Sequence, residues 1–436
     1  MPANQFLIAA PASGSGKTTV ARALMALLRQ RGLNVQPFKG GPDYIDPKFH
    51  TAVCGRASVN LDTFLASHEH VRRIYAHYGA GADVCVVEGM MGLWDGYDRS
   101  RGSSAEIARL LGLPVVLVVD ASHAAYSVAP LLKGFAQFDE GVHLQGVLFN
   151  KVGSVRHERL LRQAATDAGL TCLGCLPRRK GMEQPSRYLG LDFAQQLADE
   201  GWVQWIEDNV DVKALLRETI PATADVPKGT DATRPADEAG AEGRILVARN
   251  ADAFSFLYRV HLDVLAQVGT VTYFDPEQDT DIPADTQLVY LPGGYPELHA
   301  PALQTAEGTR RALRRYAEEG GRVLAECGGM MYLCERLLCD DSGYAMCGVL
   351  PYTVSARRAD RRLALGYRQM VYNGLPLRGH EFHYTQFAGE APLSATSVCD
   401  ALGREVPSPL VRQGNVLASY THLYWGELGN PLRLFA

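Results

Sequence analysis

A glycine-rich loop between an apolar segment and an amphipathic one is the feature that most constrains the fold of this chain. The sequence "FLIAAPASGSGKTTVARALMALL" has the order strand, loop, helix, in which backbone N–H groups can surround a phosphate. Gly16, Lys17 and Thr18 fit the pattern G-x-x-x-x-G-K-[ST], whereas Pro11 stands where its first glycine belongs. Because Gly14 supplies flexibility beside the missing glycine, we expect a nucleotide site with Lys17 at the β- and γ-phosphates and the Thr18 hydroxyl on Mg²⁺.

The residues expected to contact the nucleotide come from this loop and from the end of a later apolar strand, "LQGVLFN". They are Gly14, Ser15, Gly16, Lys17, Thr18, Thr19 and Asn150. An asparagine at a strand end resembles the one that reads a base in nucleotide-binding sheets. Asparagine is also a common turn residue, so both interpretations of Asn150 stay open.

Short apolar runs alternate with helical patterns along the whole chain. "DVCVVEG" and "PVVLVVD" predict buried strands, and "SAEIARLLG" predicts a helix between them. Such alternation favours an α/β fold with a doubly wound, mostly parallel sheet. Residues 217–243 are rich in Pro, Ala, Thr, Gly and Asp and predict a linker, after which "RILVARN", "QLVYLPGGYPE" and "GGRVLAECGG" restart the alternation. We therefore expect two α/β domains, residues 1–216 and 244–436.

Length and charge narrow the classes of partner. A chain of 436 residues is too long for one typical core, and its net charge of −5 argues against nucleic acid or an anionic membrane surface as a partner. No apolar run is long enough to cross a bilayer, and no basic region precedes the first strand as in a signal peptide. Nine scattered cysteines indicate reduced thiols in a cytoplasm. Cys172 and Cys175 form a single C-x-x-C pair, which is weak support for zinc.

Acidic residues follow two of the predicted strands. "FKGGPDYIDP" offers Asp43 and Asp46, and Glu88 ends the apolar run "VCVVE". Mg²⁺ bound to phosphates usually takes one or two carboxylates, and a carboxylate after a buried strand needs a partner or a cation. Lys39 either pairs with Asp43 or faces an anionic substrate.

The second half contains a thiol at a sharp turn. In "RVLAECGGMMYLCERLL", Cys327 lies between a strand and a helix, where a nucleophile is exposed and the helix N-terminus favours a thiolate. The following N–H, that of Gly328, can stabilise an oxyanion, and Gly293 and Gly294 in "LPGGYPE" are candidates for the second donor.

A thiol nucleophile needs a base, and three histidines are candidates. "SYTHLYWG" contains His422 after an apolar strand, and "GHEFHY" contains His380 and His383. We favour His422, because a histidine after the last strand can fold back beside the turn, and we keep His383 as the second choice.

The second domain resembles a class I glutamine amidotransferase of the cobalamin-biosynthetic variant, and the first resembles dethiobiotin synthetase. "APASGSGKTT", "FKGGPDYIDP", "NLDTF", "VEGMMGLWDG" and "AECGGMMYL" together are similar to the cobyrinic acid a,c-diamide synthase family. The chain departs from standard amidotransferases at Ala325, where the elbow has Gly, and at Tyr424, where an acid orients the histidine. The cobalamin-type variant is similar in lacking that acid.

The resemblance implies an enzyme, a carbon–nitrogen ligase with glutamine as nitrogen donor and with ATP and Mg²⁺ as cofactors. It implies Mg²⁺ ligation by Thr18, Asp43 and Glu88, and glutamine hydrolysis by Cys327 with His422. The implied acceptor is cobyrinic acid, whose a and c acetates become amides through acyl phosphates.

The residues of this chain that would contact the acceptor substrate are predicted only by their place in the quoted segments. Residues near the acceptor are expected in "FKGGPDYIDP" and "LWDGYD" and at the basic segment "SARRADRR", which is equally consistent with a solvated surface. They are Lys39, Tyr44, Asp46, Asp95, Asp98, Arg357, Arg358, Arg361 and Arg362. A homodimer is possible.

Three alternatives remain open on the sequence. Hydrogenobyrinic acid or nickel sirohydrochlorin would require the same chemistry on a different macrocycle. A partition-type ATPase switch would share the first domain, but it has no use for a thiol elbow. A regulatory protein with an inactive amidotransferase domain would explain the missing acid after His422.

Overall fold

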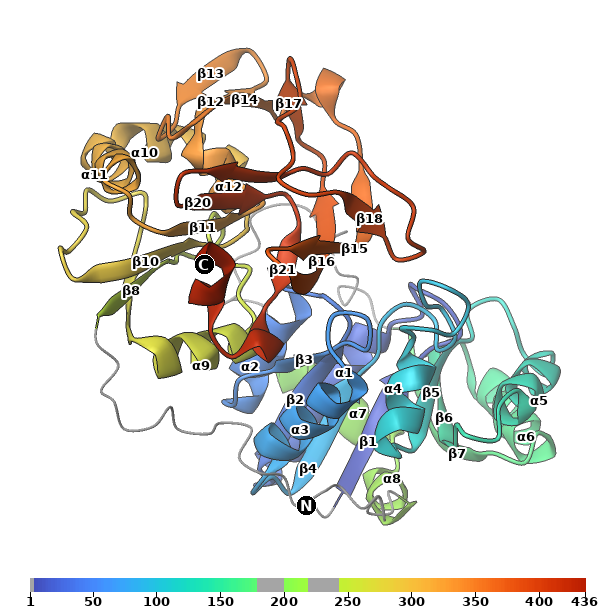
Figure 1. The fold of residues 1–436 in the computed structure, drawn as a ribbon. Helices are drawn as coiled ribbons and strands as arrows, with labels where there is room; N and C mark the ends of the chain where they lie inside the picture. Colours follow the sequence, from blue (N-terminus) through green and yellow to red (C-terminus); the bar gives the residue numbers. More distant parts are fainter. Residues whose placement is uncertain (1–3, 179–199, 219–242) are drawn as a thin grey trace. The chain divides into compact units, whose positions relative to one another are not determined.

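The computed structural model describes residues 4–178, 200–218 and 243–436. These residues form two units, one from β1 (Asn4–Ala9) to α8 (Val212–Glu218) without residues 64–66, and one from β8 (Arg244–Ala248) to the C-terminus (Figure 1). The α/β class predicted from the alternating pattern is confirmed in both. Most of the predicted linker, residues 219–242, lies outside the described residues, so its bounds stay a prediction.

The first unit is built on a seven-stranded sheet in which all neighbours are parallel, in the order β3-β2-β4-β1-β5-β6-β7. The remaining strands are β2 Val35–Gly40, β3 Val59–Leu61, β4 Val84–Glu88, β5 Val115–Asp120, β6 Leu144–Val152 and β7 Thr171–Pro177. The remaining helices are α1 Lys17–Gln30, α2 Asp46–Cys54, α3 His68–Gly79, α4 Ser104–Leu111, α5 Val128–Gln137, α6 Val155–Asp167 and α7 Glu200–Asn209.

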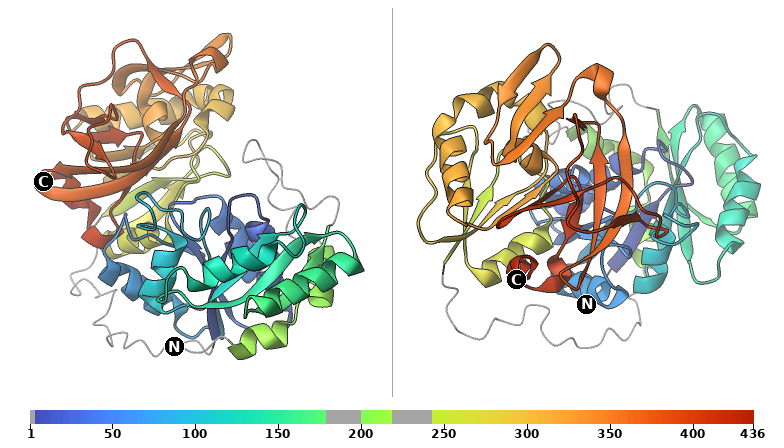
Figure 2. Two further views of the ribbon diagram at one scale, coloured as in Figure 1. Left: turned by 90° about the vertical axis from the view of Figure 1, so that its right-hand side faces the viewer. Right: turned by 45° about the horizontal axis from the view of Figure 1, so that its top comes forward.

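Helices cover both faces of this sheet, which explains why its strands are runs of apolar residues. α1 and α7 lie on one face, and α3 and α4 on the other (Figure 1). α5 and α6 pack against each other at the end of the sheet that carries β6 and β7 (Figure 2). The apolar side of α1 buries Val20, Leu24 and Leu28 in the core.

The second unit is built on a six-stranded sheet with the order β19-β20-β11-β10-β8-β9, in which only β19 is antiparallel to its neighbour. Its remaining strands are β9 Thr270–Phe274, β10 Thr286–Leu291, β11 Val323–Glu326, β19 Leu410–Gln413 and β20 Val416–Ser419. The helices are α9 Arg259–Val268, α10 Ala300–Thr305, α11 Glu307–Glu318 and α12 Gly328–Leu333, with 3-10 turns η1 Pro296–Leu298, η2 Arg358–Asp360, η3 Gly426–Leu428 and η4 Pro431–Phe435.

Two four-stranded sheets complete the second unit, with the orders β13-β12-β14-β17 and β18-β15-β16-β21. Their strands are β12 Cys334–Cys339, β13 Ser342–Ala345, β14 Leu350–Ser355, β15 Ala364–Tyr372, β16 Leu375–His383, β17 Gln386–Ala388, β18 Val398–Asp400 and β21 His422–Tyr424. α9 packs on one face of the six-stranded sheet, and α11 and α12 pack on the other. None of the helices in the described ranges combines the length and the hydrophobicity needed to cross a membrane.

Candidate active sites

The glycine-rich loop joins β1 to α1 at the carboxyl edge of the first sheet. Gly16 has φ 88°, a left-handed conformation that glycine adopts without strain. The amide of Asn150 donates to the Ser15 carbonyl at 3.0 Å, and a Cβ added at Gly16 would stand 2.1 Å from Asn150 Nδ2. The structure therefore brings Asn150 onto the loop, and it leaves no room there for a larger residue than glycine.

Lys17 and Thr18 point toward the end of β4. Lys17 Nζ donates to the Met91 carbonyl at 2.8 Å, and the Thr18 hydroxyl donates to Glu88 Oε1 at 2.5 Å. β4 lies between β1 and β2, with Glu88 beside Ile8. The order of the strands thus places the acid that ends β4 next to the first turn of α1.

A buried group of charged side chains surrounds Glu88. Lys39 Nζ lies 2.6 Å from Asp46 Oδ2 and 3.0 Å from Glu88 Oε1, while His50 Nε2 lies 2.7 Å from Glu88 Oε2. Lys39 is 3% exposed, and Glu88 and His50 are fully buried. Lys39 therefore forms an ion pair inside the protein, but with Asp46 and Glu88 rather than with Asp43 alone.

These contacts decide the protonation states in the group. Burial by itself would raise the pKa of Glu88, but the charge of Lys39 and the hydrogen bond from His50 outweigh it and hold that pKa below its ordinary range. Burial and then the charge of Asp43 raise the pKa of Asp46 to about 6, against the opposing effect of Lys39. Both carboxyls are therefore mainly ionised at neutral pH, and Asp46 is the one that takes up a proton first as the pH falls.

The oxygen atoms at this place suit a magnesium ion. Mg²⁺ prefers oxygen ligands and usually binds through one or two carboxylates together with substrate phosphates and water. The Thr18 hydroxyl and Glu88 Oε1 offer such a pair at the mouth of the phosphate loop. Asp43, the third ligand that the resemblance implies, accepts the backbone N–H groups of Ile45 and Asp46 on Oδ1 at the start of α2, and its role in binding a metal stays a prediction.

The other residues expected near an acceptor are scattered. Tyr44 is half-buried in the turn before α2, and Asp95 is exposed and accepts the N–H of Gly92 at 3.0 Å. In the basic segment, Arg358 and Arg362 are exposed, and Arg361 donates to the carbonyl of Ala356 at 3.1 Å. Their role in binding an acceptor stays a prediction.

Cys327 occupies a strained turn between β11 and α12. Its φ of 47° and ψ of −107° are unusual for a residue with a side chain, and such strain is typical of a nucleophile elbow. Cys327 is only 4% exposed, however, so the exposure expected from the sequence is wrong for this structure. Its N–H donates to the Ser419 carbonyl at 2.7 Å. Burial, followed by the charge of Glu297, raises the pKa of the thiol, whereas the N–H of Gly328 acts in the opposite direction.

Two glycine turns meet beside the thiol. A Cβ added at Gly328 would lie 3.0 Å from the backbone nitrogen of Gly294, and one added at Gly293 would lie 2.1 Å from Cε1 of His422. The structure thus brings together Gly293, Gly294 and Gly328, and it places the ring of His422 against the same turn. The role of these glycines as oxyanion donors stays a prediction. Burial, followed by the charges of His380 and His383, lowers the pKa of His422 to about 3.

His383 belongs to a separate buried group. Its Nε2 lies 2.7 Å from Glu381 Oε1, its Nδ1 lies 2.8 Å from the Thr385 carbonyl, and its ring stacks on Tyr420 at 3.7 Å. The other oxygen of Glu381 accepts from Arg368. Because both ring nitrogens of His383 face acceptors, this histidine is less suited than His422 to take a proton. His380 lies opposite His422 on the neighbouring strand.

Three buried side chains were missed by the sequence analysis: His50, Glu326 and Glu381. Glu326 and Glu88 each end an apolar strand, so the reasoning that singled out Glu88 also applied to Glu326. His50 lies one helical turn after Asp46 on α2, a spacing that could have suggested it. Glu381 lies two residues before its partner His383 on β16, in the segment "GHEFHY" that the sequence analysis quoted, whereas its other partner, Arg368, comes from the neighbouring strand β15.

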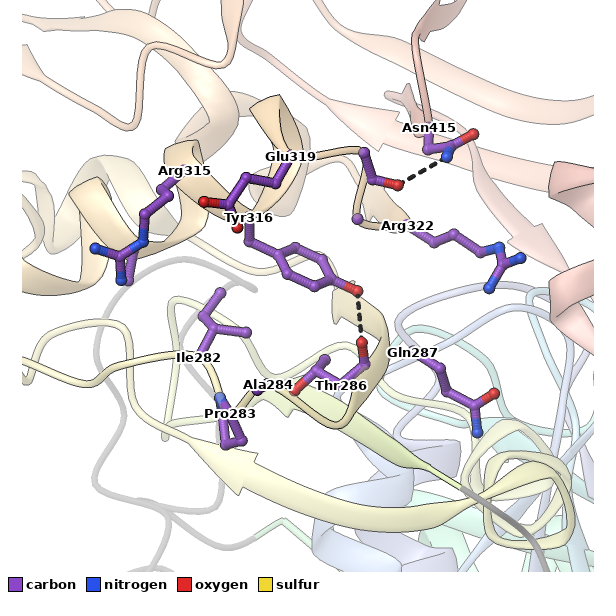
Figure 3. Close-up of a pocket in the computed structure, with 13 residues that line it drawn as sticks. Ile282, Pro283, Ala284, Thr286, Gln287, Arg315, Tyr316, Glu319, Arg322 and Asn415 are labelled. Atoms are coloured by element: carbon purple, nitrogen blue, oxygen red, sulfur yellow. Dashed lines mark hydrogen bonds between the residues drawn. The ribbon is translucent and has the colours of Figure 1, made fainter.

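Two further features lie apart from these sites. The thiols of Cys172 and Cys175 are 3.8 Å apart, and the described residues contain no group of three or more His, Cys, Asp or Glu arranged to hold a metal ion. A cavity of about 500 Å³ lies where β10 and β11 begin, lined by residues that include Arg315, Tyr316 and Arg322 (Figure 3). It is at the opposite edge of the sheet from Cys327, where ligands of parallel sheets are not usually bound.

Comparison with known proteins gives each of the two units a family. Residues 6–191 match the model of the "CobQ/CobB/MinD/ParA nucleotide binding domain", and residues 244–428 match the "CobB/CobQ-like glutamine amidotransferase domain". A protein of Streptomyces coelicolor, named hydrogenobyrinate a,c-diamide synthase, is 40% identical over 99% of this chain and 96% of its own length. The chain belongs to the CobB/CobQ family.

Other relatives carry the same name. The protein of Rhodobacter capsulatus is 43% identical over 96% of this chain and 98% of its own length, and that of Mycobacterium bovis is 41% identical over 88% and 87%. The family predicted from the motifs is thereby confirmed. The relatives are named for hydrogenobyrinate, however, and not for the cobyrinic acid that the sequence analysis put first.

Proposed function

We propose that this CobB/CobQ protein converts two acetate carboxylates of hydrogenobyrinic acid, the a and c groups, into amides, with ATP and glutamine as co-substrates. The observation that carries the proposal is the combination, in one chain, of the phosphate loop with Glu88 and the Cys327 elbow with His422. The printed names of relatives about 40% identical over nearly the whole chain support the macrocycle. Cobyrinic acid is the second candidate, because it carries the same acetates.

In the first unit, the proposed reaction turns a poor leaving group into a good one. A carboxylate does not react with ammonia, because oxide would have to leave. Transfer of the γ-phosphoryl group of ATP to the carboxylate gives an acyl phosphate and ADP, and ammonia then displaces phosphate to leave the amide.

The residues of the loop act by position and charge. Backbone N–H groups of the Gly14–Gly16 turn and the ammonium of Lys17 stabilise the negative oxygens of the phosphates. The side-chain amide of Asn150 stabilises the loop by donating a hydrogen bond to the Ser15 carbonyl. Bound Mg²⁺ would add positive charge at the phosphate oxygens, and Thr18 and Glu88 are the residues that would hold it.

In the second unit, the thiol of Cys327 attacks the side-chain amide carbon of glutamine. His422, neutral before the reaction, takes the thiol proton and passes it to the departing ammonia. The N–H groups of Gly294 and Gly328 stabilise the tetrahedral oxyanion. Water then cleaves the thioester to give glutamate and the free thiol.

The test is mass spectrometry of the macrocycle after incubation with the protein, Mg-ATP and glutamine labelled with ¹⁵N in the amide. Two successive replacements of a hydroxyl group by a ¹⁵N-amide are expected with hydrogenobyrinic acid. Conversion of cobyrinic acid or nickel sirohydrochlorin instead would keep the chemistry and change the acceptor. Failure with all three would contradict the proposal.

Two variants separate the two half-reactions. Cys327→Ser should lose amidation with glutamine but keep it with a high concentration of ammonium. Lys17→Ala should lose amidation from either nitrogen source. A Cys327→Ser protein that ammonium cannot rescue would contradict the two-site mechanism, because the first unit should not need the thiol.

A further inference from the structure

Two consecutive residues at the elbow, Glu326 and Cys327, form hydrogen bonds with the chain segment that carries His422. The N–H of Cys327 donates to the Ser419 carbonyl at 2.7 Å, and the carboxyl of Glu326 accepts the N–H of Leu423 on Oε1 at 3.2 Å. The segment from Ser419 to Leu423 is therefore held at both ends by residues 326 and 327. His422 lies within it, one residue before the second hydrogen bond.

Glu326 lies in a buried, apolar environment, where an ionised carboxylate costs free energy. Its residue is 2% exposed, and it ends the apolar strand β11. Its second oxygen, Oε2, accepts the hydroxyl of Tyr290 from the neighbouring strand β10 at 2.8 Å. Burial raises the pKa of Glu326 to about 8. Since a buried polar group costs free energy unless it is hydrogen-bonded, these two bonds explain how the carboxyl is tolerated, but not why it is there.

The position of a general base must be fixed to a fraction of an ångström, because misplacement by about 1 Å can lower a rate by about 100-fold. In many hydrolases a third group orients the histidine. Here we propose that Glu326 is a positioning residue: it holds the backbone of β21 at Leu423 and thereby keeps His422 in register with Cys327. This inference rests on the glutamine hydrolysis proposed above and adds a residue to it.

Glu381 is a second buried acid near this pair, and its contacts point to a different role. Its Oε1 is engaged by His383, and its Oε2 by Arg368. Burial opposes ionisation, but His383 and Arg368 hold the pKa of Glu381 below its ordinary value. Glu326, in contrast, uses one oxygen for the strand of the base itself, so we place the positioning role on Glu326.

The experiment compares Glu326→Gln with Glu326→Leu. Glutamine keeps a carbonyl oxygen that can accept from Leu423, whereas leucine fills similar space without an acceptor. Tyr316→Phe is the control, since it removes one hydrogen bond of 3.2 Å to the Thr286 carbonyl at the other edge of the same sheet (Figure 3). For each protein, kcat and KM for glutamine and the rate of ammonium-dependent amidation are measured.

We expect Glu326→Leu to lower kcat for glutamine by about 100-fold with little change in KM, and to leave the ammonium-dependent rate intact. Glu326→Gln and Tyr316→Phe should stay within a few-fold of the unchanged protein. An unchanged kcat in the Leu variant would overturn the inference. If the Leu variant also loses the ammonium-dependent rate, the Gln variant decides: recovery supports positioning, and an equal loss overturns it. Absence of glutamine-dependent activity in the unchanged protein would instead be a failure of the proposed function.

Discussion

The ring of His422 lies directly against the backbone of Gly293, so that a methyl group added there would stand 2.1 Å from Cε1 and about equally close to both ring nitrogens, at 3.0 and 3.1 Å. The base and the turn that offers oxyanion donors therefore fit together only because residue 293 has no side chain. The two parts of the proposed mechanism share one constraint on packing, which leads to the first prediction.

Gly293→Ala should displace His422 and lower the glutamine-dependent rate by about 100-fold, because a shift of about 1 Å in a catalytic group has that effect. The ammonium-dependent rate should not change, since it does not use the second site. Steady-state amidation assays with the two nitrogen sources check both statements. Equal losses with both would mean that the substitution acts on folding and not on the position of His422.

Gly16→Ala should remove nucleotide binding, because the new Cβ would collide with Asn150 and because Gly16 has a left-handed φ. The affinity for a fluorescent ATP analogue is the measurement. Gly134→Ala is the matched control: it lies in α5, and a Cβ at Gly134 has no heavy atom within 4 Å. A Gly16→Ala protein that binds the analogue as tightly as Gly134→Ala would remove this loop from the site.

The loop at Gly16 and the elbow at Cys327 show which parts of the structure could be predicted from the sequence. These are local patterns of strand, turn and helix, so the sequence contained both, and the α/β fold followed from the alternation of such patterns. The contact of Gly16 with Asn150 joins residues 134 positions apart, because β6 follows β5, the neighbour of β1, in the sheet. Only the order of the strands decides that contact.

The partner of Lys39 is a second case. Asp43 and Asp46 are both near Lys39 in the sequence, and the sequence analysis considered Asp43 for an ion pair. The turn before α2 directs an oxygen of Asp43 to backbone N–H groups and turns Asp46 toward the ammonium. Glu326 is harder still, since its partner Leu423 is 97 positions away and contributes only its backbone.

Glu88→Gln should destabilise the first unit by about 3–5 kcal/mol, because it removes one charge of a buried pair and leaves Lys39 with Asp46 alone. Denaturant unfolding followed by tryptophan fluorescence measures the loss. The matched control is Glu307→Gln, whose pair with Arg311 is exposed on both sides and should be worth less than about 1 kcal/mol. A loss no larger than that of the control would mean that the group around Glu88 is hydrated and not buried.

The protonation states of Cys327 and His422 lead to the last prediction. Burial raises the pKa of the thiol and lowers that of His422 to about 3, so the resting pair is a neutral thiol beside a neutral imidazole across pH 5 to 8. Iodoacetamide reacts with thiolate, and its reaction with Cys327 should therefore be slow at pH 7 and rise continuously up to pH 9, without the plateau near pH 6 that an ion pair would give. Mass spectrometry of the Cys327 peptide measures the rate, with Cys327→Ser as the background for the other eight cysteines. Fast alkylation that is independent of pH above 6 would show that the thiolate already exists before glutamine binds, and that His422 is its cation.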